Sequence, residues 1–537
     1  MEEKKILKNK LFLYLTEFFA GMSVMAIELG AQRMLAPYFS SSQIVWTIVI
    51  GSIMIAMALG NIYGGRKADK DPNPNKLYAR LIIAASWLAL IPWLGKYVIA
   101  GISAVLIFAV SSGYLVVAAT ASCIVLFIFP LFLLGTTTPC LVKYATKSLD
   151  ESGKTVGMLG AFNTIGSILG TFLPTFVTIP TIGTNLTFLI FASILLILAL
   201  VYFISIRLFQ VKSVVAVVLM IIGIIFGYKS NFAFWSEEPL YEGESMYNYL
   251  RVNQTESEVE LSTNVLFGVQ SVYSPVRRLR TGHYYDSALA AVLMANRPEE
   301  VPQEILVLGN GSGTFATQVN RYFDNTNITG VEIDGEITKL AYDYFNFSKD
   351  HKVYTYDGRA YLNVCEEKYD VIMVDAYQDI TIPFQMSSIE FFTLVKEHLK
   401  ENGVMVVNLN MRSNEEGNIN FYLCDTIASV FKVVETVDIN GSTNRLLYAS
   451  MNENMLDLFT IQLENTTDEE LKTFINNNVF DRLNEYQKGN LIFTDDKAPV
   501  ELLGISVIDT LIDEEVGFYK KIFREQGIKG LLDYLAN

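Results

Sequence analysis

Long apolar runs fill the first part of the chain, and shorter runs with a different period follow them. A helix that crosses about 30 Å of hydrocarbon needs about 20 mostly apolar residues. Such runs lie near residues 11–31, 44–63, 79–97, 114–135, 157–179 and 184–206, with a shorter one at 212–228. We expect the first run to be a span and not a cleavable signal peptide, because it lacks a small-residue cleavage site and further runs follow it. The pattern predicts a multi-span α-helical membrane domain over 1–228.

The hydrophobic pattern changes after this region. Residues 229–240 form a polar linker with aromatic anchors, and a soluble domain is expected over 241–537. Its first part, 241–280, carries alternating and β-rich pieces that are typical of a small antiparallel sheet. In 281–537, apolar strands alternate with helical patterns and helices close the chain. This order predicts an α/β Rossmann-like core preceded by a small N-terminal β-subdomain.

Composition and charge support a division of the chain into a lipid-exposed region and a water-exposed region. The 537 residues are 51% hydrophobic and 18% charged, and the mean hydropathy is +0.31. Residues 1–230 hold 17 Lys/Arg and 8 Asp/Glu, whereas the remainder holds 24 and 48. The acidic second region excludes nucleic acid as a partner, because nucleic acid is bound through basic patches. A cationic or small-molecule partner suits it better.

Metal and disulfide chemistry is not expected. The four cysteines contain no CxxC pair, and none of the three histidines lies at ligand spacing to another. The sequence therefore predicts neither a disulfide framework nor a metal site.

Polar residues inside the apolar runs are candidate functional groups. Glu17 and Glu28 lie in the first run, with Arg33 just beyond. Carboxylates within a span usually face a bundle interior or an aqueous cavity, which favours a functional or pairing site. The structural alternative is a Glu28–Arg33 ion pair at the membrane edge. The glycines that would let helices approach closely are Gly157, Gly160, Gly166 and Gly170.

The most informative run begins with the strand 305–308 and continues into a glycine-rich loop. Gly309, Gly311 and Gly313 follow the strand and precede a helical pattern, so the backbone can approach a ligand at a helix N-terminus. The next strand ends at Glu332, where a carboxylate can accept both ribose hydroxyls. A tight turn and a solvated strand end are the structural alternatives.

Two further strand ends carry acids. Asp357 and Gly358 follow the third strand, where an acid can accept from an adenine amino group, and Asp375 follows the fourth. A helix cap is the structural alternative for Asp375. Ligands bind at the carboxyl ends of the strands in such sheets, so we expect these side chains to line one site.

Together these motifs resemble a known family. Residues from about 241 to 410 are similar to the spermidine synthase (polyamine aminopropyltransferase) family, and the whole chain resembles its membrane-fused branch. The motifs are YNYLRV (247–252), LGNGSG, GVEID, YDGRAYL, DAYQDITIPFQMSSIEFF (375–392) and TDDKAPVE (494–501), with ELGAQRMLAPYFSSSQIVW and GNIYGGRKAD in the first region.

The resemblance implies a class I methyltransferase-type fold and a membrane-anchored aminopropyltransferase. Such an enzyme moves the aminopropyl group of decarboxylated S-adenosylmethionine to an amine, putrescine or a different one, and releases methylthioadenosine. By the same resemblance, Asp375 is the proton acceptor and Glu332 binds the ribose. Asp357 and Gly358 bind the adenine, and Asn248 stands where the family has a Gln that contacts the thionucleoside.

The chain departs from the family at the amine site. Ser312 replaces an Asp that binds the amine, Gln378 replaces the second acid of an Asp-X-X-Asp pair, and Tyr285 replaces a His. Charge-assisted contacts are stronger than neutral ones, so a dication such as putrescine should bind poorly unless Asp379 or Asp286 compensates.

The orientation of the soluble domain is ambiguous. Lys and Arg cluster before the first apolar run and after the second, fourth and sixth, which places these loops inside. Seven spans would then put the soluble domain outside, whereas a nucleoside co-substrate is kept in the cytosol. Either 212–228 lies along the interface or re-enters, or 98–112 is an additional span. We expect six crossings in the cell membrane, a non-crossing final segment and a cytoplasmic soluble domain.

Two other functions fit the same motifs. One is a methyltransferase that uses intact S-adenosylmethionine; the other is a non-catalytic nucleoside- or polyamine-binding regulator coupled to a transport-like membrane domain. The C-terminal segment reads as one or two amphipathic helices that could dock on the domain, on a second copy as in a homodimer, or on the lipid surface. Asp495 and Asp496, in TDDKAPVE, either line the acceptor pocket or form a solvated turn.

Overall fold

The chain forms two compact units. The computed structural model describes residues 6, 9–110, 113–146, 152–208, 211–236, 238–265, 269–276, 278–280, 282–295, 301–376, 382–410, 412 and 417–535. The first unit comprises Met1–Glu237, Glu242–Tyr249 and Asn264–Leu266, and the second comprises Glu238–Tyr241, Leu250–Thr263 and Phe267–Asn537.

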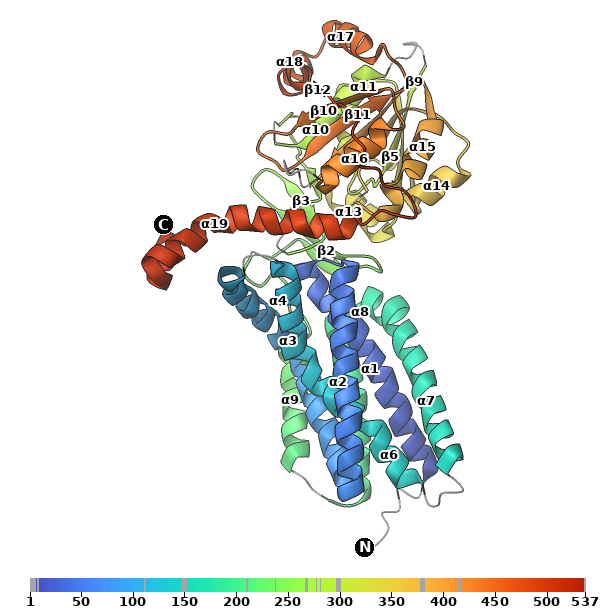
Figure 1. The fold of residues 1–537 in the computed structure, drawn as a ribbon, viewed down its shortest axis with the longest axis vertical. Helices are drawn as coiled ribbons and strands as arrows, with labels where there is room; N and C mark the ends of the chain where they lie inside the picture. Colours follow the sequence, from blue (N-terminus) through green and yellow to red (C-terminus); the bar gives the residue numbers. More distant parts are fainter. Residues whose placement is uncertain are drawn as a thin grey trace. The chain divides into compact units, whose positions relative to one another are not determined.

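The first unit is a bundle of long apolar helices (Figure 1). In chain order these are α1 (Lys10–Phe39), α2 (Gln43–Lys70), α3 (Pro74–Ala109), α4 (Tyr114–Cys123), the π-helix η2 (Ile124–Ile128), α5 (Phe129–Gly135), α6 (Thr137–Ala145), α7 (Ser152–Leu173), the π-helix η3 (Pro174–Thr178), α8 (Ile179–Ser205) and α9 (Val211–Gly227).

Five helical stretches among the described residues are long and apolar enough to cross a membrane. They are Lys10–Phe39, Gln43–Lys70, Pro74–Ala109, Tyr114–Ala145 and Ser152–Ser205, and α9 is a shorter apolar helix. The last of the five bends at Gly183, where φ is +82°, so it contains the two predicted runs 157–179 and 184–206. Each predicted run therefore lies in a helix.

One alternative for the number of spans is wrong. Residues 98–109 continue α3 without a break, so this part of 98–112 does not form a separate helix. The 36 residues of α3 correspond to a helix of about 54 Å, which is longer than the hydrocarbon thickness of about 30 Å.

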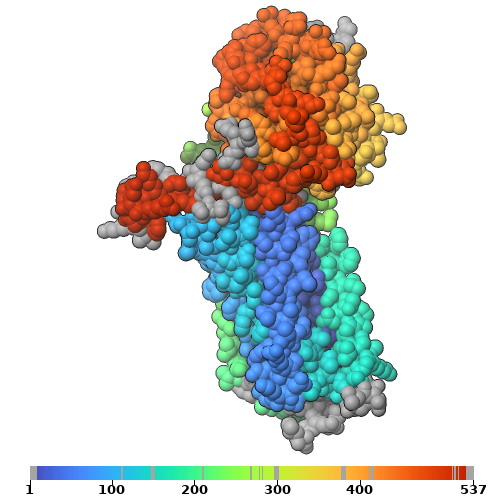
Figure 2. Space-filling model, in the orientation of Figure 1, coloured from blue at the N-terminus to red at the C-terminus, as the bar shows by residue number. Residues whose placement is uncertain are grey.

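The outer surface of the bundle is apolar. On α2, which lies on the viewed face in blue, Met54, Ile55, Leu59 and Ile62 are all more than half exposed (Figure 2). Soluble proteins rarely expose a contiguous apolar surface of this kind, whereas helices that contact lipid do.

Glycines set the closeness of α1 and α7. A Cβ atom on Gly166 or Gly170 would overlap the main chain of α1 at Phe18 or Met22. Gly157 and Gly160 have open space around them, so only two of the four predicted positions act in helix contact.

A small antiparallel sheet is present, as the alternating pattern predicts. Its strand order is β1-β2-β3-β4, with β2 and β3 antiparallel and β3 and β4 antiparallel. The strands are β1 (Tyr241–Glu244), β2 (Tyr249–Gln254), β3 (Val259–Ser262) and β4 (Ser271–Tyr273).

The second unit is built on an eight-stranded sheet of order β12-β10-β11-β9-β8-β5-β6-β7. Strands β9 to β7 in this order are parallel, and β10, β11 and β12 add an antiparallel edge. The strands are β5 (Gln303–Leu308), β6 (Thr326–Glu332), β7 (Lys352–Thr355), β8 (Tyr369–Val374), β9 (Leu399–Leu409), β10 (Val433–Asp438), β11 (Arg445–Ser450) and β12 (Asn484–Glu485).

Helices connect the strands and cover the sheet. They are α10 (Tyr284–Ala288), α11 (Ala290–Met294), α12 (Thr314–Tyr322), α13 (Gly335–Tyr344), α14 (Gly358–Val364), α15 (Ile389–Glu397), α16 (Ile419–Ala428), α17 (Met455–Asn465), α18 (Glu469–Asn478) and α19 (Val500–Leu535), with 3₁₀ turns η4 (Phe384–Met386) and η5 (Phe480–Arg482). The strand side chains Val307, Met373 and Val406 lie in the main hydrophobic core. The predicted Rossmann-like α/β fold is confirmed.

Candidate active site

Four neighbouring strands bring the predicted residues to one edge of the sheet. The strands β8, β5, β6 and β7 are adjacent and parallel, so their carboxyl ends meet. The glycine loop follows β5, Glu332 ends β6, Asp357 follows β7, and Asp375 follows β8. Residues that are up to 66 positions apart in the chain thus lie together at the carboxyl-terminal edge of the sheet.

The glycine loop needs glycine at two positions for different reasons. Gly309 has a φ of +83°, and a Cβ there would lie 2.5 Å from the carbonyl oxygen of Asp375. Gly313 has a φ of +80°, and a Cβ there would overlap the ring of Phe347. The loop therefore packs directly against the residue that follows β8, and a larger side chain cannot enter.

Asp375 is a buried carboxyl held at both oxygens. Tyr284 donates its hydroxyl to Oδ2 at 2.7 Å, and Asn408 donates its amide Nδ2 to Oδ1 at 2.9 Å. Burial raises the pKa of Asp375 to about 7, the two hydrogen bonds oppose this shift, and the carboxylate of Glu332 adds to it. A carboxyl with a pKa near neutrality can take up and release a proton under physiological conditions.

Glu332 is the second buried carboxyl of the site. Its Oε2 accepts from the backbone N–H of Gly311 at 2.8 Å, and its Oε1 accepts from that of Asp334 at 3.0 Å. Burial raises the pKa of Glu332 to about 7, although these backbone bonds oppose the shift. Each carboxylate oxygen has a further lone pair, so both can still accept from a ligand hydroxyl.

Asp357 has a local structural role as well as a predicted one. Its Oδ1 accepts from the backbone N–H of Ala360 at 2.8 Å, which caps α14, and Gly358 is the first residue of that helix. A cap was the structural alternative for Asp375, but the side-chain contacts of Asp375 are with Tyr284 and Asn408. One oxygen of Asp357 is committed to the cap, and the other is the candidate for a nucleobase.

Buried polar atoms without partners surround the glycine loop. Ser312 is 2% exposed and Asn310 is 5% exposed. Neither the Ser312 hydroxyl nor the Asn310 side-chain amide has a hydrogen-bond partner among the described residues. Buried polar groups in proteins are normally bonded, so these atoms indicate a ligand site at the loop.

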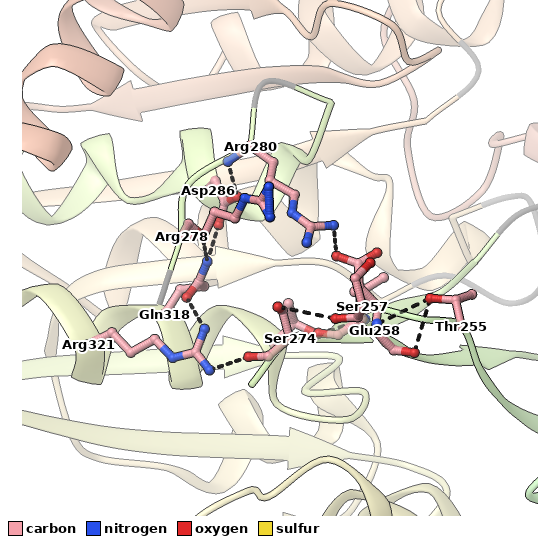
Figure 3. A network of polar contacts seen from close by, with 11 residues as sticks. Thr255, Ser257, Glu258, Ser274, Arg278, Arg280, Asp286, Gln318 and Arg321 are labelled. Atoms are coloured by element: carbon pink, nitrogen blue, oxygen red, sulfur yellow. Dashed lines mark hydrogen bonds and ion pairs between the residues drawn. The ribbon is translucent and has the colours of Figure 1, made fainter. Parts of the chain in front are cut away.

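Tyr285 and Asp286 follow Tyr284 on α10, on the side of the site assigned to the amine. Tyr285 is buried, and its pKa is raised by burial and by the carboxylates of Asp286, Asp375 and Glu260. Each oxygen of Asp286 already accepts one hydrogen bond: Oδ2 accepts from the backbone N–H of Arg280 at 2.8 Å, and Oδ1 accepts from Gln318 (Figure 3). Asp286 is 1% exposed and these bonds give it a structural role, and its compensation for the charge missing at Ser312 stays a prediction.

The bonds around Asp286 continue as a network of fixed polar groups (Figure 3). Arg321 donates to Oε1 of Gln318 at 3.1 Å and to the carbonyl oxygen of Ser274 at 2.6 Å. The side chain of Arg280 pairs with Glu258. Each of these charged groups has a partner, so the network orders the loop before α10.

Glu260 is a carboxylate near Tyr285 that the sequence did not single out. It pairs in register with Val272, and Val272 belongs to the main core, so Glu260 points from β3 toward the same side as that core. Its charge acts on Tyr285, as does that of Asp375. Glu260 is thus a further acid, among the described residues, whose charge reaches Tyr285.

For three predicted site residues the structure gives no position relative to this cluster. Gln378 and Asp379 lie outside the described residues. Asn248 belongs to the first unit, where it precedes β2 and its backbone N–H donates to Ser245 Oγ at 2.9 Å. Its contact with a nucleoside stays a prediction.

Asp495, one of the two acids in TDDKAPVE, contacts the loop predicted to bind the adenine. Arg359, the residue after Gly358, donates to both of its oxygens at 2.7 Å, and Ser388 donates to Oδ1 at 2.5 Å. Asp495 and Asp496 are exposed and lie in a turn, which agrees with the solvated-turn alternative, and the contacts of Asp495 also hold the start of α14 in place.

Tyr284, Asn408, Asn310 and Glu260 are site residues that the sequence analysis did not name. Tyr284 adjoins Tyr285 in the chain, and Asn408 stands near the end of β9, so a strand-end argument could have found both. No local pattern marks Glu260. Among the described residues, no group of three or more His, Cys, Asp or Glu could hold a metal ion.

Comparison with known proteins gives matches to the second unit and to most of the chain. Residues 282–439 match the family model for the spermine/spermidine synthase domain. A probable polyamine aminopropyl transferase of Bifidobacterium longum is 48% identical over 349 residues, 62% of this chain and 77% of that protein. An eEF1A lysine and N-terminal methyltransferase of Xenopus laevis is 25% identical over 184 residues, 32% of this chain and 26% of that protein. The solved spermidine synthase of Thermotoga maritima has a TM-score of 0.35 and 15% identity, covering 52% of this chain and 87% of that one.

Proposed function

The chain belongs to the spermine/spermidine synthase family and is a transferase of the polyamine aminopropyltransferase type, and we propose that Asp375 is its proton acceptor. The single observation that carries the proposal is the setting of this carboxyl. It is buried beside the glycine loop, held by Tyr284 and Asn408, and its pKa is raised to about 7.

The proposed reaction needs a neutral amine. An ammonium ion has no lone pair, so Asp375 as carboxylate first removes a proton from it. The amine nitrogen then attacks the propyl carbon bonded to the sulfonium sulfur. The new C–N bond forms as the C–S bond breaks, and the electron pair stays on sulfur in methylthioadenosine. The sulfonium is already a good leaving group, so positioning supplies most of the remaining catalysis.

The nucleoside part of the proposal assigns each strand end one contact. Glu332 accepts from the ribose hydroxyls, Asp357 accepts from the adenine amino group, and Gly358 lets the base approach. The orphan side-chain atoms of Asn310 and Ser312 supply two more polar contacts. Two buried carboxylates suit a cationic ligand, so decarboxylated S-adenosylmethionine fits the site better than a molecule that carries its own carboxylate.

The acceptor is an amine whose distal charge is bound by Glu260 in place of the family's acid. Asp286 is less suited to this role, because it is 1% exposed and both of its oxygens already accept, one from Arg280 and one from Gln318. Ser312 and Tyr285 contribute neutral contacts only. We therefore propose that the enzyme binds putrescine more weakly than other members of the family do, and that it accepts a different amine. Glu260→Gln should lower the affinity for any acceptor that carries a second positive charge.

Purified full-length protein with decarboxylated S-adenosylmethionine and a panel of amines tests the proposal. We expect release of methylthioadenosine with at least one amine and loss of release in Asp375→Asn. The matched control is Asp370→Asn, which removes a buried acid at the other end of the same strand. No release with any amine, or release that Asp375→Asn leaves intact, contradicts the proposal.

A methyltransferase is the second candidate, favoured by the likeness to an eEF1A lysine and N-terminal methyltransferase. The products separate the two reactions, because methylation yields S-adenosylhomocysteine and aminopropyl transfer yields methylthioadenosine. A regulator without turnover would bind nucleoside in calorimetry and yield neither product.

Membrane anchoring is a further part of the proposal. It is supported by five helices of sufficient length and apolarity and by the exposed apolar face of α2. Alkaline carbonate washing, which strips peripheral proteins, should leave the chain in the membrane pellet, and recovery in the supernatant would contradict anchoring.

A further inference from the structure

A carboxyl group is completely buried in the helix bundle of the first unit. Glu17 is 0% exposed and lies seven residues after the start of α1. At 1.5 Å per residue this is about 10 Å along a helix of 30 residues. The proposed transferase reaction gives this group no task.

Two other helices supply the neighbours of Glu17. Thr138 on α6 donates its hydroxyl to Oε1 at 2.5 Å, and Asn163 on α7 donates its Nδ2 to the same oxygen at 2.8 Å. Gly21, one turn further along α1, makes room for this amide, since a Cβ there would lie 3.0 Å from Asn163 Nδ2. Three helices are therefore arranged to satisfy one oxygen of the carboxyl.

The second carboxyl oxygen of Glu17, Oε2, is not hydrogen-bonded to any of the described residues. The same holds for the buried hydroxyl of Thr137, which adjoins Thr138. Neither donor to Oε1 carries a charge. Tyr78 on α3 bonds to Thr16, the residue before Glu17, at 3.2 Å. An isolated carboxylate in an apolar interior is costly, so Glu17 either takes up a proton or pairs with another positive charge at Oε2.

The chemistry of the donors limits what this ligand can be. Among the described neighbours the atoms are oxygen and amide nitrogen, with no thiolate or imidazole, which excludes a soft metal. One carboxylate balances one positive charge, whereas Ca²⁺ takes about six to eight oxygen ligands, usually with several acids.

We propose that Oε2 of Glu17 binds one monovalent cation, a proton or an alkali-metal ion, inside the helix bundle. The site is separate from the transferase site, and it gives the first unit a binding activity of its own. The shared chemistry is a single positive charge at Oε2, and the experiment below distinguishes the two sources.

The first test uses dicyclohexylcarbodiimide, which reacts with protonated carboxyl groups in apolar surroundings. The full-length wild-type protein in lipid nanodiscs is labelled at low and high pH, in sodium chloride or choline chloride, and the adduct on Glu17 is quantified by mass spectrometry. If the ligand is a proton, labelling falls as the pH rises and sodium has no effect. If it is an alkali-metal ion, sodium protects Glu17 and choline does not. Labelling that responds to neither overturns the proposal.

The second test is thermal unfolding of the same preparation. A ligand that binds only the folded state raises the unfolding midpoint as its concentration rises. The wild-type midpoint should therefore rise with sodium or with falling pH, and Glu17→Gln should lose this response. Glu28→Gln is the matched control, since Glu28 lies on the same helix and is half-buried. Equal responses of wild type and Glu17→Gln overturn the proposal, even if no labelling is obtained.

Discussion

At the scale of single residues, the burial of Asp375 serves the reaction at the cost of stability. Its pKa is raised to about 7 in the folded protein, against an ordinary value of about 3.9 for Asp. The folded state therefore binds the proton more tightly than the unfolded state. This contribution to stability is complete below about pH 4 and is lost as the pH rises through about 7.

Asp375→Asn should separate the two consequences of this burial. We expect aminopropyl transfer to fall by about two to four orders of magnitude, the usual contribution of a positioned general base. The wild-type unfolding midpoint should drop between pH 5 and 8 more than that of the variant, because the variant has no carboxyl to ionise there. Scanning fluorimetry across pH measures this difference, and equal slopes would contradict the assigned burial.

Asn408 should act through Asp375 and not on substrate. Its hydrogen bond lowers the pKa of that carboxyl, so Asn408→Ala should shift the rising limb of the pH–rate profile to higher pH. A hydrogen bond to a charged group contributes about 1.5–3 kcal/mol, so the rate near pH 7 should fall by about tenfold to a hundredfold. KM for the nucleoside should stay unchanged. A raised KM with an unshifted profile would make Asn408 a binding residue instead.

At the scale of elements, the glycine loop depends on the packing behind it as well as on its own sequence. Gly313 combines a φ of +80° with the ring of Phe347, which fills the place of a Cβ atom. The residues before α12 identify the loop, but the phenylalanine that closes over it comes from the segment after α13.

Gly313→Ala should destabilise the protein more than backbone strain alone can explain. The matched control is Gly441→Ala, since Gly441 has a φ of +73° with open space around it. Positive φ costs a non-glycine residue about 1–3 kcal/mol, and overpacking adds about 1–3 kcal/mol. In denaturant unfolding, Gly313→Ala should therefore lower the free energy of unfolding more than Gly441→Ala does. Only Gly313→Ala should weaken nucleoside binding. Equal losses of stability would mean that Phe347 moves aside.

At the scale of the whole molecule, the proposed membrane anchoring makes the number of crossings decide on which side the second unit lies. The structure removes one alternative, since 98–109 belong to α3. A decarboxylated S-adenosylmethionine-dependent enzyme needs cytosolic co-substrate, which supports a cytoplasmic second unit with α9 as a non-crossing segment.

A reporter fused after residue 537 should therefore report a cytoplasmic C-terminus. The control is a fusion after the loop between α2 and α3, whose Lys and Arg predict an inside position. Both fusions should give the same side. Opposite sides would mean an odd number of crossings between the two points and a catalytic unit without access to cytosolic nucleoside.

The sequence alone determined the features that depend on residues close together in the chain. Apolar runs of span length, the period change near residue 241 and the strand–glycine loop–helix pattern are local, so the helices, the small sheet and the acids at 332, 357 and 375 could be predicted. Only the tertiary structure decided which partners each acid has. Gln318 and the backbone of Arg280 occupy Asp286, Asn408 holds Asp375, and Thr138 and Asn163 reach Glu17 across more than 100 residues of chain. Such contacts arise from the packing of distant elements, and no period or spacing in one stretch of sequence encodes them.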